Sequence, residues 1–378
     1  MFNGDTTVSG SVTATEFIGD GSQLTGLPTG FSPNDTDSSG IQSATNTASG
    51  TYSTAMGKNT TANGDYSTAM GYNSTASESF STAMGYETIA SGDTSTAIGE
   101  STTASGYAST AMGFGTTASG DFSSAMGYTT EANGDYSTAM GRDTQASATY
   151  STAMGRATTA SATYSTAMGS YATASGSNST AMGNTTEASG TDSTAMGYST
   201  TASGASSTAM GYTTEANGDY STAMGYTTEA NGDYSTASGF DTTASGTSST
   251  AMGQSTEASG DASTAMGYDT TASGTSSTAM GYDTEASGGA STAMGFETTA
   301  SGDASTAMGY GTTASDFGST VIGLFNNSLS SITSGGSATS FNLANTAFVI
   351  GNGTGSGSKS DAFKVMFNGD AYVSSSLY

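Results

Sequence analysis

The chain has 378 residues, 54 of which are Gly, and it contains no Cys, His or Trp. Its 31 acidic residues outnumber its 5 basic ones, so the formal net charge is −26. This composition excludes disulfides, thiolate or histidine metal sites and His-based triads, and so acidic a chain is expected to bind no nucleic acid. Because no apolar run approaches the ~20 residues of a membrane span and no signal peptide opens the chain, we also expect no membrane insertion.

Residues 1–40 predict an N-terminal β cap followed by a loop. Val8, Val12 and Phe17 belong to a strand-like alternation, and a Gly-rich turn follows at residues 19–21. The only two prolines, Pro28 and Pro33, mark a loop from about residue 28 to residue 40.

A column of mostly Met residues recurs every 14 positions from Met56 to Ile322, which gives (322 − 56)/14 + 1 = 20 copies. The unit reads S-T-A-M-G-x-x-T-T-A-S-G-D-Y, and Ser238 is the one polar residue in the column. The apolar members are Met56, Met70, Met84, Ile98, Met112, Met126, Met140, Met154, Met168, Met182, Met196, Met210, Met224, Met252, Met266, Met280, Met294, Met308 and Ile322.

Fourteen residues are too few for a two-helix repeat, and the density of Gly, Ser and Thr opposes helix. Two strands of about five residues and two tight turns fit this length, so residues 41–323 predict an all-β solenoid, a parallel β-roll of about twenty coils. Ile41 and Ala44 form an imperfect first coil. With coils ~4.8 Å apart, the roll is a rod of roughly 95 Å.

Period-2 alternation along each strand predicts which side chains face the interior. Ser53, Ala55, Thr60 and Ala62 are expected inside, in a narrow core of small residues, and Gly57 is expected to need a positive φ or a close backbone approach. The Met column must then face outward, together with Thr54 and Thr61. Because a continuous apolar stripe is untenable on a free rod, we expect three chains to pack their Met columns around a common axis as a homotrimer.

Two further columns carry aromatic residues, one two positions after the Met column and one four positions before it. The first is expected at a turn, with the greater exposure, and the second, which begins at Tyr52, near the subunit boundary. Packing between coils and subunits is one interpretation of both columns, and binding of sugars or of another cell's surface is the other. Candidate surface-binding residues in the first column are Tyr72, Tyr86, Phe114, Tyr128, Tyr198, Tyr212 and Tyr226.

Acidic motifs recur along the repeats without forming a unique pocket. Asn-Gly-Asp occurs at 63–65, 133–135, 217–219 and 231–233, where tight turns explain it better than calcium binding. A Glu column beginning at Glu131 repeats on an open surface, which does not suit acid–base catalysis. We therefore predict no catalytic residue, no metal site and no cofactor, and a protein that is not an enzyme.

Residues 324–378 predict a C-terminal connector and a β-hairpin cap. The 14-residue period fails from Leu324 to Asn345, and Asn368-Gly369 is a strong hairpin turn between two alternating segments. The pentapeptide 366–370 is identical to residues 1–5, which indicates either a turn motif used twice, one module of a longer array, or subunits joined end to end. The residues of that end-to-end contact would be Phe2, Asn3, Gly4, Phe367, Asn368 and Gly369.

The S-T-A-M-G and A-S-G motifs resemble the 14-residue, haemagglutinin-type head repeats of YadA-like trimeric autotransporter adhesins, over about residues 44–323. The resemblance implies a left-handed parallel β-roll in an intertwined homotrimer. Residues 10–30 and 348–374 resemble segments that flank such rolls in phage tail fibres and related appendages.

We therefore expect an extracellular, non-enzymatic, trimeric fibre or adhesin shaft, carried by a virion or a cell surface, that attaches to a glycan or protein receptor on a host cell or other surface. One alternative is a structural filament subunit assembled end to end through the terminal FNGD strands. Another is the head of a bacterial trimeric autotransporter adhesin. Ice binding by the columns of Thr60 and Thr61 is disfavoured, because Glu and Gln interrupt the outward column.

Overall fold

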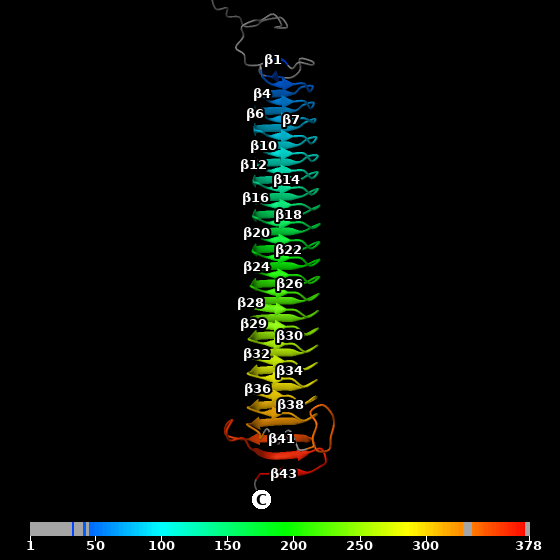
Figure 1. The fold of residues 1–378 in the computed structure, drawn as a ribbon, viewed down its shortest axis with the longest axis vertical. Coiled ribbons are helices and arrows are strands. Elements are labelled where there is room, and N and C mark those ends of the chain that lie inside the picture. The colour runs from blue at the N-terminus through cyan, green and yellow to red at the C-terminus, as the bar shows by residue number, and fades with distance from the viewer. Residues whose placement is uncertain (1–31, 34–40, 43–44, 328–334, 375–378) are drawn as a thin grey trace, which may run out of the picture.

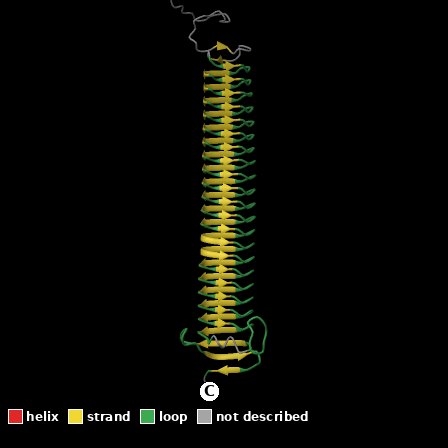
Figure 2. Cartoon of the chain, viewed as in Figure 1, coloured by secondary structure: helices red, strands yellow, loops and turns green. Residues whose placement is uncertain are grey.

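A computed structural model describes residues 32–33, 41–42, 45–327 and 335–374 of the chain. These residues form a straight rod of stacked coils, with β43 at the end farthest from β1 (Figure 1). The described residues contain strands and loops but no helix (Figure 2). The prediction of an all-β solenoid built from 14-residue coils is confirmed.

Each coil contains one long and one short strand, for example β4 (Thr54–Lys58) and β5 (Thr61–Ala62). The prediction of two strands of about five residues was wrong for the second strand, which has only two. The reason is that both turns contain a residue in the left-handed region, Asn59 with φ 57° and Tyr66 with φ 59°. These turns occupy positions that the sequence pattern had assigned to extended backbone.

The strands repeat with the same bounds from coil to coil. The other long strands are β6 (Thr68–Tyr72), β8 (Thr82–Tyr86), β10 (Thr96–Glu100), β12 (Thr110–Phe114), β14 (Ser124–Tyr128), β16 (Thr138–Arg142), β18 (Thr152–Arg156), β20 (Thr166–Ser170), β22 (Thr180–Asn184), β24 (Thr194–Tyr198), β26 (Thr208–Tyr212), β30 (Thr250–Gln254), β32 (Thr264–Tyr268), β34 (Thr278–Tyr282), β36 (Thr292–Phe296), β38 (Thr306–Tyr310) and β40 (Thr320–Leu324). The other short strands are β3 (Thr47–Ala48), β7 (Thr75–Ala76), β9 (Ile89–Ala90), β11 (Thr103–Ala104), β13 (Thr117–Ala118), β15 (Glu131–Ala132), β17 (Gln145–Ala146), β19 (Thr159–Ala160), β21 (Thr173–Ala174), β23 (Glu187–Ala188), β25 (Thr201–Ala202), β27 (Glu215–Ala216), β31 (Glu257–Ala258), β33 (Thr271–Ala272), β35 (Glu285–Ala286), β37 (Thr299–Ala300) and β39 (Thr313–Ala314). In two coils a single strand spans both positions, β28 (Thr222–Ala230) and β29 (Thr236–Ala244).

Within the repeats, long strands pair with long strands and short strands with short strands, in parallel and exactly one repeat apart. Met56 pairs with Met70 on one stack, and Ala62 pairs with Ala76 on the other. The coil is therefore the unit that stacks, and every column of the sequence repeat becomes a straight row along the rod.

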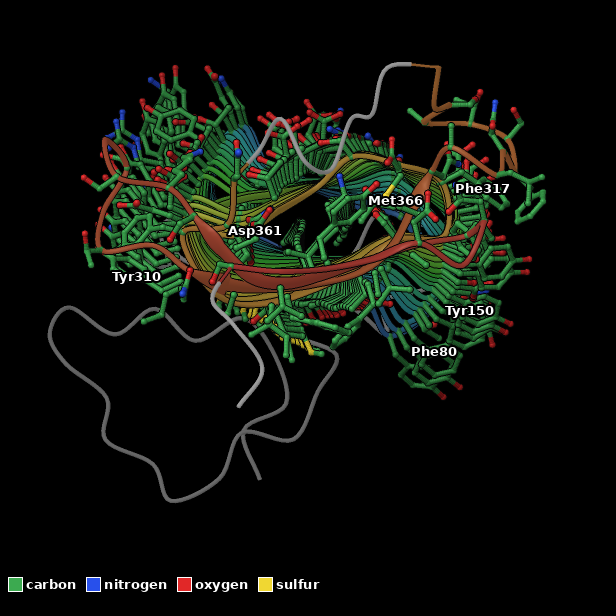
Figure 3. The ribbon with its side chains drawn as sticks, turned by 90° about the horizontal axis from the view of Figure 1, so that it is seen from below. Phe80, Tyr150, Tyr310, Phe317, Asp361 and Met366 are labelled. Atoms are coloured by element: carbon green, nitrogen blue, oxygen red, sulfur yellow. The ribbon has the colours of Figure 1, made fainter. Side chains whose placement is uncertain are left out.

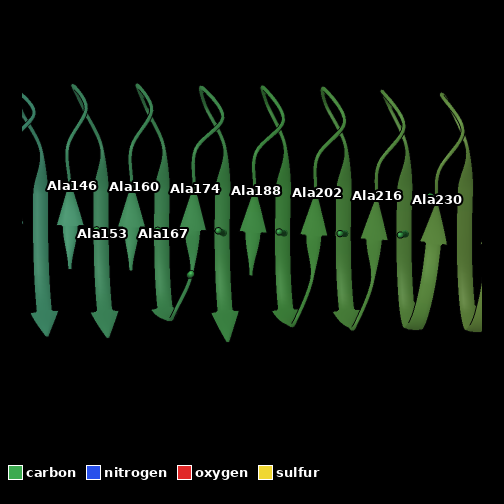
Figure 4. Close-up of a cluster of buried hydrophobic side chains, with 14 of the residues drawn as sticks. Ala146, Ala153, Ala160, Ala167, Ala174, Ala188, Ala202, Ala216 and Ala230 are labelled. Carbon is green, nitrogen blue, oxygen red and sulfur yellow. The ribbon is translucent and has the colours of Figure 1, made fainter. Parts of the chain in front are cut away.

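The interior consists of four rows of small side chains. Ser53, Ala55, Thr60 and Ala62 have no exposed surface, and nearly the same is true of their equivalents along the roll. Figure 4 follows one stretch of this interior, where Ala side chains from both strand stacks are drawn. The predicted interior of Ala, Ser and Thr is confirmed.

Gly57 shows why its column tolerates no side chain. Its φ is 126°, and a Cβ added there would lie 1.9 Å from the carbonyl oxygen of Gly71 in the next coil. Both reasons predicted for this column, a positive φ and a close backbone approach, are confirmed.

At the N-terminal end of the described chain, β1 (Ser32–Pro33) pairs antiparallel with β2 (Ile41–Gln42). The loop predicted between positions 28 and 40 was therefore too long, since Pro33 lies in a strand, at an edge position where its missing N–H is tolerated. β2 stacks on β4 with Ile41 opposite Thr54, which is one position short of a full repeat and accounts for the imperfect first coil. The strand and turn predicted within residues 1–27 lie outside the described residues.

The long-strand stack continues beyond Ile322, where the sequence analysis had ended the roll. β41 (Thr346–Asn352) pairs in parallel with β40, and Ile350 lies opposite Ile322, two full periods later in the sequence. β41 thus joins the stack in phase with β40, so the period fails in the sequence without ending the sheet. β42 (Asp361–Met366) then pairs antiparallel with β41, and β43 (Ala371–Val373) with β42.

Candidate interaction surfaces of the roll

The column from Met56 to Ile322, here called the Met face, forms one continuous stripe along the rod. None of its members is buried by its own chain, and Met224 and Met252 are the most exposed Met residues, at 36% and 39%. Viewed along the axis, the sulfur atoms gather on one broad side of the section (Figure 3). The outward direction predicted for this column is confirmed, and its burial by two further chains stays a prediction.

Twelve aromatic residues two positions after the Met column line one edge of the rod, here called the Tyr72 edge. Their rings stack from coil to coil: Tyr212 lies between Tyr198 and Tyr226, with ring centroids 4.8 Å apart on both sides. Tyr310 marks this edge in Figure 3. All seven predicted surface-binding aromatics lie here, and the structure does not test whether they bind anything.

Nine aromatic residues four positions before the Met column line the opposite edge, here called the Tyr52 edge. Tyr150 and Tyr164 stack in parallel with centroids 4.9 Å apart. Phe80 and Tyr150 mark this edge in Figure 3, across the section from Tyr310. The Met face therefore lies between two aromatic edges.

The Tyr52 edge is the more exposed of the two in the single chain, and the relative exposure expected for the assembled trimer stays a prediction. Tyr52 is 57% exposed and Tyr234 60%, whereas Phe296 on the other edge is 37% exposed. Tyr52 lies in a turn at φ 57°, outside β4, and strand alternation therefore does not fix the direction of its side chain. The placement of this column near a subunit boundary stays a prediction.

The broad side opposite the Met face carries Thr61 and its equivalents, here called the Thr61 face. Its polar character is visible as the oxygen atoms on that side of the section in Figure 3. The Glu column occupies positions of this face, and Glu131 accepts hydrogen bonds from Asn133 and Gln145, both at 3.1 Å. Because Thr60 is buried, only the interrupted Thr61 column remains for the disfavoured ice-binding hypothesis.

The Asp residues of the Asn-Gly-Asp motifs join consecutive coils. The Asp135 carboxylate accepts the backbone N–H of Asp121, the equivalent residue one coil earlier, at 3.0 Å. Asp233 and Asp219 repeat this contact at 3.0 Å. The geometry supports the turn interpretation, and the described residues contain no cluster of three acidic side chains that would hold a metal ion.

Asn326 closes the C-terminal end of the short-strand stack. It occupies the Thr60 column, is fully buried, and its Oδ1 accepts the Thr313 N–H at 2.7 Å while its Nδ2 donates to the Thr313 carbonyl at 3.0 Å. The Asn326 side-chain amide thus takes the place of the backbone groups of a further coil, which would otherwise hydrogen-bond to Thr313 in β39. Asn46, at the other end of the same column, accepts the N–H of Thr60 at 3.0 Å. Neither residue was predicted as a cap, although an Asn at each end of a column of Thr, Ser and Ala indicates where the stack of coils ends.

The C-terminal hairpin leaves its last strand open. Its turn follows Met366, and Asn368 bonds to Asp370 twice, through its Nδ2 at 2.8 Å and its Oδ1 at 2.9 Å. All three residues of β43 are exposed. Of the predicted end-to-end contact, Phe367, Asn368 and Gly369 lie at this turn, whereas Phe2, Asn3 and Gly4 lie outside the described residues.

Charged groups on the described surface are mostly acidic and weakly paired. Arg142 and Asp143 form an ion pair at 3.2 Å whose side chains are largely exposed, and Lys58 lies over the Tyr72 ring at 5.5 Å. The negative charge of Glu87 is the main cause that raises the pKa of the Tyr86 hydroxyl above its ordinary value.

Comparison with known families identifies this repeat. The profile described as the YadA head domain repeat, two copies of the unit long, matches residues 48–74 and successive segments as far as 300–326, which together cover more than half of the chain. The chain belongs to the YadA head domain repeat family. Comparison with curated proteins gave no significant match. In the parts of the chain that the structure describes, no helical segment has the length and hydropathy of a membrane span.

Proposed function

We propose that this protein is the non-enzymatic shaft of a homotrimeric, extracellular fibre or adhesin, by which a virion or a cell attaches to a surface. Membership of the YadA head-repeat family supports an adhesin-type head. The observation that carries the trimer is the Met face, a stripe of Met and Ile side chains interrupted once by Ser238, which the single chain leaves partly exposed.

The interior of one chain explains why partners are needed. It contributes only methyl groups and small hydroxyls, and the hydroxyls of Ser53 and Thr60 have no hydrogen-bond partner. The Met face is a long apolar surface that the chain itself covers only in part. Met224 and Met252 are 36% and 39% exposed and the other members less, so covering what remains contributes at most ~0.5–1 kcal/mol for each Met. Over the nineteen apolar levels this is at most roughly 10–20 kcal/mol per chain, enough to drive association and the folding of the rod together.

Replacing Met140, Met154 and Met168 together by Gln tests the trimer. Gln matches Met in length but brings a polar amide. Amides stacked on three consecutive coils satisfy only part of one another's hydrogen-bonding groups, so their burial is unfavourable and trimer and fold should be lost together. The matched control adds Gln on the opposite face, Thr159→Gln with Thr173→Gln, next to the natural Gln145. Circular dichroism and light scattering should show the control unchanged. A stable folded monomer from the triple Met variant would contradict the proposal.

Attachment along the sides is proposed for the Tyr72 edge, because stacked rings at 4.8 Å offer a flat surface to a sugar or a protein. Replacing Tyr198, Tyr212 and Tyr226 by Ser should reduce adhesion of the soluble trimer to cells or glycan arrays without changing its oligomeric state. The Tyr→Phe triple keeps the stacking and isolates the role of the hydroxyls. Unchanged adhesion of the Ser triple would exclude this edge as the binding surface.

A filament built end to end is a second candidate, favoured by the open β43 edge and by the identity of residues 1–5 with 366–370. Electron micrographs of the purified protein should then show rods that lengthen with concentration. Single rods of one length at every concentration would contradict end-to-end assembly.

The carrier of the fibre is proposed to be a virion, with the head of a bacterial autotransporter adhesin as the alternative. The proposed trimer is intertwined and its roll left-handed, as the family resemblance implies, and we propose β caps at both ends from the strand alternation of the flanking segments. Immunogold labelling of intact particles and of cells separates the two carriers, because the label decorates virion appendages in one case and the bacterial surface in the other.

A further inference from the structure

The Met face is nearly the same at every level of the rod. Each Met has an equivalent directly above and below it in the parallel stack, as Met140 has in Met126 and Met154. A chain that slides along its partners by one coil, ~4.8 Å, therefore places Met against Met again and gives up only one of twenty levels. A purely periodic stripe holds three chains together without fixing their relative height.

Ser238 is the one residue that interrupts this periodicity with a polar group. It pairs in register with Met224 on one side and Met252 on the other. Those two residues are the most exposed members of the Met column, because the short Ser side chain between them covers neither thioether. The Met face therefore has a single position with a short polar side chain, Ser238, here called the notch. It lies 13 coils after Met56 and 6 before Ile322.

We propose that Ser238 fixes the axial register and the parallel orientation of the three chains; this inference rests on the proposed trimer. When the chains are in register, three Ser238 hydroxyls meet at one level, where each donates to one neighbour and accepts from the other. The flexible side chains of Met224 and Met252 fill the space above and below them.

A displaced chain loses this arrangement. Its Ser238 faces thioethers, which are weak acceptors, so a buried hydroxyl is left without a partner. An inverted chain meets the same mismatch, because the notch is 13 levels from one end and 6 from the other. This use of one polar residue in an apolar seam is the device that sets register and orientation in coiled coils.

Disulfide trapping measures the register directly, since the natural chain has no Cys. Chains carrying Met140→Cys and mass-tagged chains carrying Met168→Cys are unfolded, mixed and refolded in three backgrounds: the natural sequence, Ser238→Met, and Ser238→Met with Met210→Ser. In register the two positions lie ~9.6 Å apart along the axis, beyond the ~7 Å Cα separation that a disulfide spans. A disulfide between two chains that both carry Met140→Cys reports any trimer, whereas one between the two different positions requires a slip of at least one coil.

We expect the mixed disulfide to be near background in the natural sequence and at least five-fold higher in Ser238→Met. It should fall back to background when Met210→Ser restores one notch at another level. If the mixed disulfide stays at background in Ser238→Met while disulfides between equivalent positions form normally, the register role is wrong and the trimer stands. If no background forms disulfides between equivalent positions, the chains do not meet at the Met face, and the proposed function fails with the inference.

Discussion

Replacing Gly155 by Ala is expected to break the rod between two coils. Gly155 has a φ of 124°, and a Cβ added there would lie 2.0 Å from the carbonyl oxygen of Gly169 in the next coil. Ordinary van der Waals contact begins at 3.4 Å, so the two coils must separate locally to admit the methyl group.

The loss of stability caused by Gly155→Ala has two contributions. Holding Ala in this backbone conformation costs about 1–3 kcal/mol, and each hydrogen bond lost between the separated coils costs ~1 kcal/mol. With two or three bonds lost, the substitution destabilises each chain by roughly 3–6 kcal/mol. Because coils of a solenoid contact only their neighbours, the damage stays local. Thermal unfolding should shift downward, and limited proteolysis should cut between residues 155 and 169 to leave two resistant rods.

Gly115 provides the matched control. It also has a positive φ, 60°, but an added Cβ meets only Thr129 Oγ1 at 3.9 Å, and Asn59 occupies the equivalent position in the first coil. Gly115→Asn should therefore change the stability by less than ~0.5 kcal/mol. An unchanged melting temperature and an unchanged digestion pattern for Gly155→Ala would refute the reasoning about close backbone approach.

Three further substitutions test other contacts of the coil. Asn326→Ala should speed amide hydrogen exchange at Thr313 and destabilise the C-terminal coils by ~1–3 kcal/mol, because Thr313 loses both hydrogen bonds to the Asn326 side chain. Equal protection of the Thr313 amide in both proteins would contradict the capping role. Asp135→Ala should lower the free energy of unfolding by ~0.5–1.5 kcal/mol, because the Asp121 N–H loses its acceptor. Asp135→Asn keeps an acceptor and should keep most of the stability. Equal melting temperatures for the two variants would contradict this role of Asp135. Ala153→Leu should destabilise the fold by ~1–3 kcal/mol or more, because an interior row with no exposed surface has no room for three extra carbons. A melting temperature at or above that of the natural chain would show that the interior is wider than the structure indicates.

The repeat made the fold predictable from sequence. A single coil is ambiguous, but twenty copies with the same Ala, Ser and Gly positions leave one arrangement in which every column stacks on itself. The parallel register of Met56 with Met70 and the burial of Ala55 and Thr60 follow from periodicity and strand alternation alone. For the same reason the outward direction of the Met face was predictable.

Features that depend on turns and ends were not predictable in this way. Tyr52 adopts left-handed backbone, which alternation cannot anticipate in a residue other than Gly, so alternation does not fix the direction of its side chain. β41 rejoins the stack only after two full periods, so a search for consecutive copies of the repeat stops at Ile322. The two hydrogen bonds between Asn326 and Thr313 are made by a side chain where the repeats use backbone groups, so the repeat itself does not predict them.

The mass of the native particle tests the central claim most directly. Sedimentation equilibrium of the unmodified protein at low micromolar concentration should give three times the single-chain mass of 37.0 kDa. In the same sample the Met residues should be protected from mild peroxide oxidation. A particle of 37.0 kDa with a β-rich circular dichroism spectrum and rapidly oxidised Met residues would contradict a rod whose stability depends on a shared thioether seam.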